Sequence, residues 1–350
     1  MKKRKRRRRM SRMERMRRKR IRSTVLLLFL LTVLAGGGGF FLYTVKGGMM
    51  KSLNQPFSVV KEFSNPLVSG NKRQRSDLFA KNLCVVGGNI TLDSSLLDTT
   101  EKGLLLDVTR KDVMFSQGAF DRVYPASITK LMTAILAFKY GNMSDTVTIT
   151  QDDVTMEEAA QVCGFQPGDQ VTMEQLLNCL LVYSGNDAAS AIANHVGGST
   201  AGFVQMKNSY AASLGCTGTH FTNPHGLHDP EHYTTPYDIY LILKEALNYP
   251  DFTVITQQPS YTVTYTRADG SQISTWLEAT DHYLTGEAAT PRDVKVLGGK
   301  TGYTSDAGNC LALLSQNAYG QPYVSVVMGA DTKNDLYIQM NSLLQNINET

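Results

Sequence analysis

The sequence predicts an α/β fold of the α+β type, in which a mainly antiparallel sheet is flanked by helices and joined to a helical lobe. Three observations predict it: strand-like patterns near residue 103, helical periodicity from about 127 to 250, and strand-like patterns again after about 260. Hydrophobic residues make up 42% of the 350, which is enough for one large core or two smaller ones and excludes global disorder. We expect a functional site between the sheet and the helical lobe.

The formal net charge of +4 is the sum of two opposed parts. Residues 1–22 contain fifteen Lys or Arg and one acid, whereas the remainder contains twenty basic and thirty acidic residues, a net charge of −10. Because the part of the chain that can fold is acidic, we predict no nucleic-acid partner. The basic segment alone would also suit a nuclear-import patch, but the apolar run beside it favours a membrane.

An uncharged apolar run over residues 23–45 follows the basic segment. As a helix it would reach roughly 34 Å, enough for a hydrocarbon core about 30 Å thick, so we predict one transmembrane helix that contacts the lipid bilayer. The positive-inside rule then makes residues 1–22 a basic cytoplasmic tail and places everything after Lys46 outside the membrane. The mixed polar residues 46–82 are expected to be an extracytoplasmic stalk, and residues 83–350 the folded domain. A cleaved signal peptide would have a shorter apolar core and a small-residue cleavage site.

The first half of the folded domain predicts strands followed by helices. Two strands around a turn at Thr109–Lys111 are predicted for residues 103–117. Apolar residues at helical spacing predict a helix over Ser127–Phe138. Thr172–Gln175 is a capping box before the apolar run LLNCLLVY, and the small apolar residues of Asp187–His195 suit a buried helix.

The second half begins with a helix and then changes to strands. Thr235 is expected to cap a helix that has Pro236 at its first position. A hairpin is predicted around Asp269-Gly270, and three buried strands are predicted for VKVLGG, GNCLALLSQ and PYVSVVMGA, the last two joined through Asn317–Gly320. A helix over Asn334–Gln345 closes the chain.

Three short motifs occur in order within this domain: Ser127-Ile-Thr-Lys130, Ser184-Gly-Asn186 and Lys300-Thr301-Gly302. Singly the first two are weak, because the chain contains other matches such as Ser58-Val-Val-Lys61. Their order and their surroundings, PASITKLMTA, SGNDAA and GGKTGYT, make the set specific.

The spacing of the first motif suits a nucleophile and its base. A serine hydroxyl is a poor nucleophile unless a base lies within hydrogen-bond reach, and positions i and i+3 of a helix share one face, so Lys130 is expected beside Ser127. Ser127 follows Pro125 at a helix N-terminus, where free backbone N–H groups favour a developing oxyanion. Burial and the second cation Lys300 would lower the pKa of Lys130 and so allow it to act as a base.

The other two motifs supply polar contacts. Ser184 can pass a proton from the base to a leaving amine, and the Asn186 amide can bind a substrate peptide group, although both residue types also suit a plain helix N-cap. Gly302 and its neighbouring glycines leave room for a substrate backbone along a strand edge, where Lys300 and Thr301 would meet a carboxylate.

With these motifs the chain resembles the serine D-alanyl-D-alanine carboxypeptidases, the low-molecular-mass penicillin-binding proteins of the peptidase S11 family. The resemblance covers residues 83 to 345 approximately and includes GFQPGDQVTMEQLL, FVQMKNSYAASLG, THFTNPHGL and TTPYDIYLI. It implies a β-lactamase/transpeptidase-like fold with the active site between sheet and helical lobe, no cofactor and no metal. It also implies these roles: Ser127 as nucleophile, Lys130 as general base, Ser184 as proton relay beside Asn186, the backbone N–H groups of Ser127 and Tyr303 as the oxyanion hole, and Lys300, Thr301 and Gly302 as substrate-binding residues.

The resemblance implies an enzyme of the bacterial cell membrane whose catalytic domain, residues 83–350, lies outside the cell. It would remove the terminal D-alanine of peptidoglycan stem peptides through an acyl-enzyme, and β-lactam antibiotics would be covalent inhibitors. Some positions depart from the family. Lys207 stands where a methionine is common, and in DTKNDLYIQ only Lys333 lies near the place where many members have an Arg for the terminal carboxylate. Many members also have a further β-domain and a C-terminal amphipathic anchor, so here we expect the N-terminal span to anchor the protein.

Other functions fit less well. A DD-endopeptidase or transpeptidase on the same site stays open, because the fold and motifs do not fix the acceptor. A class A β-lactamase needs a glutamate on a loop between the second and third motifs, and here that region has Asp229 and Glu231 without the pattern of that loop. A non-catalytic wall-binding module predicts a lost nucleophile or base, and both are present.

A zinc site and a disulfide framework are also considered. His225, His228 and His232 fall close together, but the intervening Pro and Gly forbid one helix face, and His-Glu-x-x-His is absent. The five Cys exclude a disulfide-stapled scaffold. Cys179 and Cys310 lie in apolar runs and are expected to be buried thiols, while one disulfide among the five stays open.

Overall fold

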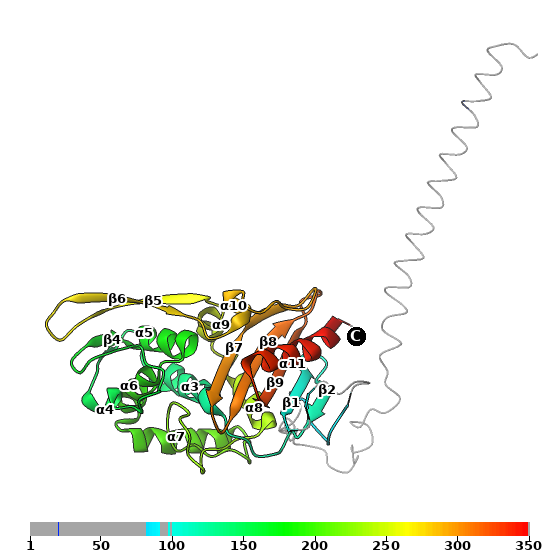
Figure 1. The fold of residues 1–350 in the computed structure, drawn as a ribbon, viewed down its shortest axis with the longest axis horizontal. Coiled ribbons are helices and arrows are strands. Elements are labelled where there is room, and N and C mark those ends of the chain that lie inside the picture. Colours follow the sequence, from blue (N-terminus) through cyan, green and yellow to red (C-terminus); the bar gives the residue numbers. More distant parts are fainter. Residues whose placement is uncertain (1–19, 21–81, 92–96, 99, 349–350) are drawn as a thin grey trace, which may run out of the picture. The chain divides into compact units, whose positions relative to one another are not determined.

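The computed structural model describes residues 20, 82–91, 97–98 and 100–348 (Figure 1). The predicted tail, transmembrane helix and stalk lie outside the described residues, apart from Arg20 and Asn82. Within the part that is described, no helix is both long and apolar enough to cross a membrane.

The main sheet has five strands in the order β2-β1-β9-β8-β7, and all neighbouring pairs are antiparallel. Its strands are β1 (Lys102–Asp107), β2 (Asp112–Gln117), β7 (Lys295–Thr304), β8 (Gly308–Gln316) and β9 (Pro322–Ala330). The first and the last strand of the domain are therefore neighbours, with Lys102 opposite Met328. The predicted antiparallel sheet is confirmed, and β7, which carries the Lys-Thr-Gly motif, lies at its edge.

Alternate residues of this sheet face two different cores. Leu104 and Leu106 belong to the core shared with the helical lobe, whereas Leu105 between them belongs to the core under α11 (Lys333–Gln345). This period of two is what a sheet covered on both faces requires. The predicted C-terminal helix is confirmed, and it covers the face of the sheet opposite to the lobe.

The helical lobe is built around α3, whose residues Lys130–Ala137 are all buried. Its helices are α3 (Lys130–Tyr140), α4 (Gln151–Val154), α5 (Met173–Asn178), α6 (Asn186–Gly197), α7 (Thr200–Ser213), α8 (Pro236–Ala246) and α9 (Pro250–Thr256), with α10 (His282–Thr285) following the lobe and the turn η3 (Asn346–Asn348) following α11. Thr172 and Gln175 form the predicted capping box of α5, and Thr235 caps α8 as predicted, with Pro236 at the first position.

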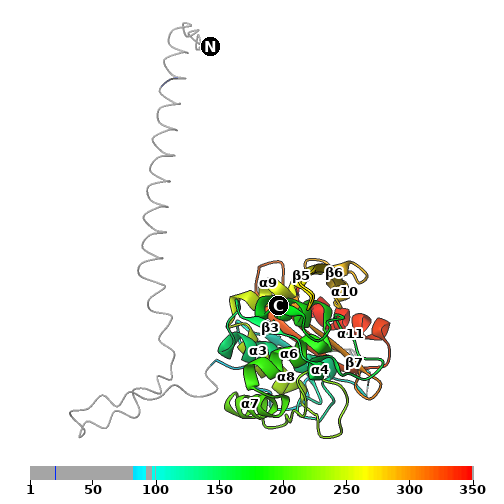
Figure 2. The ribbon, with the colours of Figure 1, turned by 90° about the vertical axis from the view of Figure 1, so that its left-hand side faces the viewer.

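The structure corrects two details of the predicted lobe. The helix predicted from Ser127 begins with a 3-10 turn, η1 (Ala126–Thr129), and α5 continues into a π-helical turn, η2 (Cys179–Tyr183). A second antiparallel sheet of order β3-β4-β5-β6 lies along the lobe, and Figures 1 and 2 show its hairpin β5–β6 on the side opposite to α7. Its strands are β3 (Thr146–Thr148), β4 (Gln170–Thr172), β5 (Ser260–Thr266) and β6 (Gln272–Glu278). The predicted hairpin at Asp269-Gly270 is thus confirmed, but β3 and β4 were missed.

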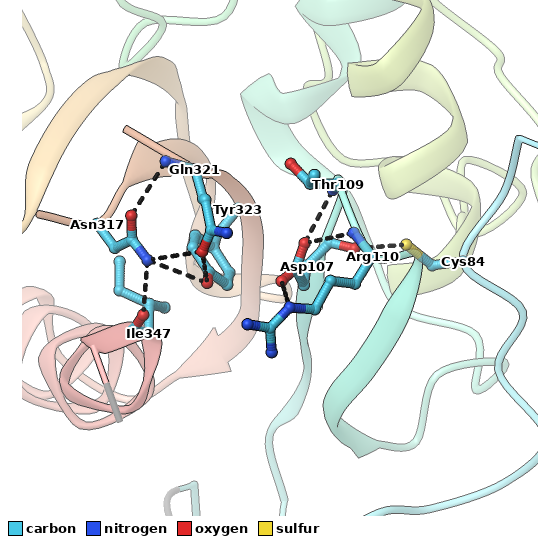
Figure 3. Close-up of polar contacts among 8 residues, drawn as sticks. All are labelled: Cys84, Asp107, Thr109, Arg110, Asn317, Gln321, Tyr323 and Ile347. Carbon is cyan, nitrogen blue, oxygen red and sulfur yellow. Dashed lines mark hydrogen bonds and ion pairs between the residues drawn. The ribbon is translucent and has the colours of Figure 1, made fainter. Parts of the chain in front are cut away.

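Two turns of the main sheet that the sequence predicts are held by side chains (Figure 3). The Asp107 carboxylate accepts hydrogen bonds from the backbone N–H groups of Thr109 and Arg110, both at 2.8 Å, and so closes the β1–β2 turn. The Asn317 amide donates to Gln321 Oε1 at 3.0 Å and to the Ile347 carbonyl at 3.3 Å, which joins the β8–β9 turn to the end of the chain's last helical turn.

Candidate active site

Ser127 lies in η1, immediately before α3, in a strained stretch of backbone. Pro125 caps η1, and the next residue, Ala126, has a φ of +46°. Positive φ is rare for residues other than glycine and persists only where the surroundings enforce it. Here Gly226 packs directly against Ala126: a Cβ on Gly226 would lie 1.9 Å from the Ala126 carbonyl oxygen. This close contact helps to hold the Ala126 backbone in place. The Ser127 side chain is half-buried and faces a pocket.

The Lys130 amine is fully buried and has three oxygen neighbours. Nζ lies 2.8 Å from Ser127 Oγ, 2.6 Å from Asn186 Oδ1 and 2.8 Å from the His225 carbonyl oxygen. The amide and carbonyl oxygens can only accept, whereas the serine hydroxyl can donate. Nζ donates to all three oxygens, and Ser127 Oγ is the only one of the three that can instead donate its hydrogen to a neutral amine. Burial first, then the charges of Lys300 and Lys207, hold the pKa of Lys130 well below its usual range.

The Ser184-Gly-Asn186 motif forms a tight turn between η2 and α6. Ser184 has φ +72° and ψ +33°, and a Cβ on Gly185 would lie 2.4 Å from Cys163 Sγ, so only glycine fits there. Asp187 accepts hydrogen bonds from Cys163 N and Gly164 N, both at 3.0 Å, which fixes this turn against the preceding loop. The cap residue of α6 is Gly185, so the plain side-chain N-cap weighed from the sequence is not formed.

The third motif runs along the edge strand β7. A Cβ on Gly302 would lie 3.0 Å from Ser127 N, so the strand passes in direct contact with the turn that holds the serine. Thr301 Oγ1 lies 2.5 Å from Thr280 Oγ1. Because β7 pairs only with β8 among the strands that the structure describes, its other edge can hydrogen-bond to an extended peptide.

Lys300 is buried within this edge strand and donates to the Thr301 carbonyl oxygen at 3.0 Å. Burial lowers the pKa of Lys300 to about 7, while the nearby Asp281 acts to raise it. Burial in turn raises the pKa of Asp281 to about 6. Lys300 can therefore be charged or neutral near pH 7, and the carboxyl of Asp281 affects which form is present.

One pocket of about 210 Å³ collects side chains from the three motifs. Its lining includes Ser127, Ser184, Asn186, Thr301, Tyr303 and Lys333. The structure therefore brings the residues predicted from the motifs to one place, with Lys333 of α11 at the same pocket. Lys130 and Lys300 lie behind this lining, in contact with Ser127 and Thr301 respectively. The Ser184 hydroxyl forms no hydrogen bond to the described part of the chain, so the relay contact with Lys130 is not formed.

Sequence reasoning missed the loop that completes the Lys130 site. The His225 carbonyl accepts from the amine, and Asn223 Oδ1 accepts from Gly226 N at 2.7 Å and so closes the loop. The segment NPHGL carried a signal only through its resemblance to the family, because a backbone carbonyl has no side-chain signature. Lys207, which was noted only as a departure from the family, also contacts this loop through the Asn223 carbonyl.

The three neighbouring histidines have separate partners. His232 Nε2 lies 2.7 Å from Thr129 Oγ1, and His228 Nδ1 lies 3.6 Å from Asp306. Among the described residues, no group of three His, Cys, Asp or Glu side chains is arranged to hold a metal ion. All five cysteines are buried free thiols, so the disulfide that the sequence left open is not formed, and Cys179 and Cys310 are buried as expected.

The chain is similar in sequence to a known protein family and to several curated proteins. The family model described as D-alanyl-D-alanine carboxypeptidase, Peptidase S11, matches residues 97–332. Similar curated proteins are D-alanyl-D-alanine carboxypeptidase DacF of Bacillus subtilis (31% identity, 72% of this chain and 62% of the relative) and DacA of Haemophilus influenzae (29% identity, 71% and 61%). The chain thus spans about three fifths of the length of these relatives.

Solved structures give the same result for the fold. The Streptomyces K15 DD-transpeptidase matches with a TM-score of 0.64 and 25% identity over 73% of this chain and 100% of the other. A D-alanyl-D-alanine carboxypeptidase from Mycobacterium tuberculosis matches with a TM-score of 0.63 and 27% identity over 74% and 93%. The predicted transpeptidase-like fold is confirmed.

Proposed function

Because the chain belongs to the peptidase S11 family of D-alanyl-D-alanine carboxypeptidases, we propose that it is a serine carboxypeptidase that removes the terminal D-alanine of peptidoglycan stem peptides. One observation carries the proposal: the Lys130 amine is fully buried, which lowers its pKa, and lies 2.8 Å from Ser127 Oγ, within reach of the serine proton. That pair is the activated nucleophile that acyl transfer requires.

In the proposed reaction the stem peptide lies extended along the free edge of β7, with its terminal carboxylate near Lys300 and Thr301. Lys333 lines the same pocket and is a second cation for this carboxylate. Positive charge at this end selects substrates with a free C-terminus, because only a carboxylate forms charge-assisted hydrogen bonds with these amines.

Acylation then proceeds through Ser127. Its oxygen attacks the carbonyl carbon of the penultimate D-alanine while its proton passes to Lys130. The backbone N–H groups of Ser127 and Tyr303 bind the oxyanion. The C–N bond breaks, and the Ser184 hydroxyl, once it has turned to contact Lys130, passes the proton from Lys130 to the leaving amine of the terminal D-alanine. Asn186 holds both Lys130 and the substrate amide.

Deacylation needs a water molecule that attacks the ester on Ser127, with Lys130 as the base for the water proton. A β-lactam would acylate the same serine and leave slowly, which would make such antibiotics covalent inhibitors. An amine in place of the water would give transpeptidation. The similarity to the Streptomyces DD-transpeptidase supports this as a second candidate function. The peptide acceptor, not the serine chemistry, separates the two.

The test uses the full chain and a peptide ending in D-Ala-D-Ala. We expect release of free D-alanine, and loss of at least about a thousandfold in kcat for Ser127→Ala, because the nucleophile is gone. Ser213→Ala, an exposed serine at the end of α7, is the matched control and should keep full activity. No D-alanine from the unchanged protein would reject the carboxypeptidase function. Transfer to an added amine in preference to water would indicate the transpeptidase.

A further inference from the structure

Lys207 is a second fully buried lysine, on α7, that the proposed reaction does not use. Its Nζ donates to the Asn223 carbonyl at 3.1 Å, to Thr133 Oγ1 at 3.2 Å and to the Thr129 carbonyl at 3.4 Å. It also lies 4.3 Å from the centre of the Phe221 ring. A buried amine with four such contacts is an organised site and not a lysine left in a core by chance.

The contacts of Lys207 identify its protonation state. Both carbonyl oxygens can only accept, and Thr133 already gives its own hydrogen to the Pro224 carbonyl at 2.6 Å, so its oxygen accepts as well. Three acceptors require three N–H groups, which an ammonium has and a neutral amine lacks. The Phe221 ring face also favours a cation. Burial lowers the pKa of Lys207. Hydrogen bonds to three acceptors favour the charged form and act in the opposite direction.

The acceptors of Lys207 lie on the two backbone segments that hold the Lys130 amine. Thr129 directly precedes Lys130 at the start of α3. Asn223 belongs to the loop in which the His225 carbonyl accepts a hydrogen bond from Lys130. Lys207 therefore joins the start of the catalytic helix to the loop opposite it.

Given the proposed function, we propose that Lys207 is a positioning residue of the active site, whose ammonium joins Thr129, directly before Lys130, to Asn223 in the loop that holds the Lys130 amine. A positive charge at this place also disfavours a proton on Lys130. Other charges also face Lys130. Lys300 of β7 acts in the same direction as Lys207, whereas Asp187 of α6 and Cys163 of the adjoining loop act in the opposite direction.

Two histidines of the same region complete the electrostatic surroundings. Burial, together with Lys130 and Lys207, lowers the pKa of His225 to about 3. Burial and Lys207 lower the pKa of His232 to about 2. Both rings are therefore neutral at physiological pH, and the positive charges near Lys130 come from the two lysines, Lys207 and Lys300.

Removal of the Lys207 charge should make Lys130 easier to protonate. In Lys207→Gln and Lys207→Met, the midpoint of Lys130 titration is expected to rise by about one pH unit, the order expected when one nearby charge is removed. The acid limb of kcat/KM would move upward by the same amount, which is about a tenfold loss of activity at a pH below that limb. Gln keeps two N–H groups for the acceptors and Met keeps none, so a shift common to both reports charge, not hydrogen bonding.

The test titrates the full chain labelled with carbon-13 at the lysine ε-carbons, and the Lys130 signal is assigned by its loss in Lys130→Arg. This measurement needs no turnover, so it stands even if the carboxypeptidase assay fails. Lys139→Met, which removes an exposed lysine from the same helix as Lys130, is the matched control and should leave the midpoint unchanged. Lys207→Arg keeps the charge and should keep the parental midpoint.

A parental Lys130 midpoint in folded Lys207→Gln or Lys207→Met would overturn the proposal, whatever happens to activity. A loss of kcat/KM that is equal at every pH would also overturn it, because that result indicates a purely structural residue. If Lys207→Met does not fold, Lys207→Gln decides the question alone.

Discussion

Three lysine amines, those of Lys130, Lys207 and Lys300, are buried in this domain, and their hydrogen-bond partners give them different chemistry. Lys130 lies beside the Ser127 hydroxyl, and burial lowers its pKa, which suits a base. Lys207 has three acceptors, which suits an ammonium. Lys300 has one carbonyl partner and the nearby charge of Asp281, and its pKa of about 7 leaves its charge adjustable. Residue type alone does not assign these roles; the atoms around each amine do.

Asp281→Asn is expected to weaken substrate binding within a limited pH window. Asp281 raises the pKa of Lys300, so its neutralisation lowers that pKa and leaves Lys300 less charged between about pH 6 and 7. KM should rise several-fold in that window while kcat changes little, since about one pKa unit is at stake. Near pH 5 the parent's Asp281 is itself protonated, so the two proteins should converge there.

The measurement is the pH profile of KM for a D-Ala-D-Ala peptide. Asn also caps helices well, so the N-cap hydrogen bond that Tyr283 N donates to residue 281 in α10 should survive the substitution. Asp269→Asn, in the exposed β5–β6 turn, is the control. A KM increase that persists at pH 5 would show that the effect is structural and not electrostatic.

At the scale of elements, the site depends on how closely β7 approaches η1. The strand carries Lys300 and Thr301 on the same edge that touches the serine turn, and Gly302 makes that contact possible. On the other side the loop containing Gly226 presses on Ala126 and holds its positive φ. The nucleophile is thus held between a strand and a loop, each of which needs a glycine at the point of contact.

Gly302→Ala should reduce activity without unfolding the protein. The new Cβ would lie 3.0 Å from Ser127 N and 3.1 Å from Ala126 Cβ, so β7 and η1 must separate by a few tenths of an ångström. Displacement of reacting groups of that order should lower kcat/KM at least about tenfold.

Steady-state kinetics and a thermal melt together check this expectation. Gly88→Ala, where a Cβ meets nothing within 4 Å, is the matched control and should behave as the parent. Unchanged kcat/KM in Gly302→Ala would mean that the strand and the turn have freedom that the contact does not suggest.

At the scale of the whole molecule, local sequence patterns predicted local structure well. Ser127 and Lys130 meet because they are three residues apart, and Thr172 and Gln175 cap α5 for the same reason. Contacts between distant residues had no such signal. The His225 carbonyl at Lys130 and the Lys207 ammonium at Thr129 depend on packing among α3, α7 and a loop, which no local pattern encodes.

The short strands were missed for a related reason. β3 and β4 have three residues each, too few for an alternating pattern, and each pairs with a strand more than twenty residues away in the sequence. The 3-10 turn at η1 was missed because its geometry follows from Ala126, whose positive φ is enforced by Gly226 from far along the chain. Contacts between catalytic residues could be predicted where the residues are close in the sequence. They could not be predicted where the fold brings distant residues together.

The location of the whole protein is the last prediction. We propose that residues 23–45 anchor it in the bacterial membrane, with residues 1–22 inside and residues 83–350 outside, because the basic segment favours the cytoplasm. An epitope tag at the C-terminus should be accessible to antibody on intact protoplasts, whereas a tag at the N-terminus should require lysis. The opposite pattern, or release of the tagged protein into the medium, would contradict this topology.

The pairing of β1 with β9 has a consequence for synthesis. Lys102 can pair with Met328 only after Met328 has been synthesised. The centre of the main sheet therefore stays unpaired until nearly the whole domain has left the ribosome. Such late, long-range pairing is slow and leaves an apolar strand edge exposed in the nascent chain. The main sheet therefore cannot be completed before its last strand, β9, has been synthesised.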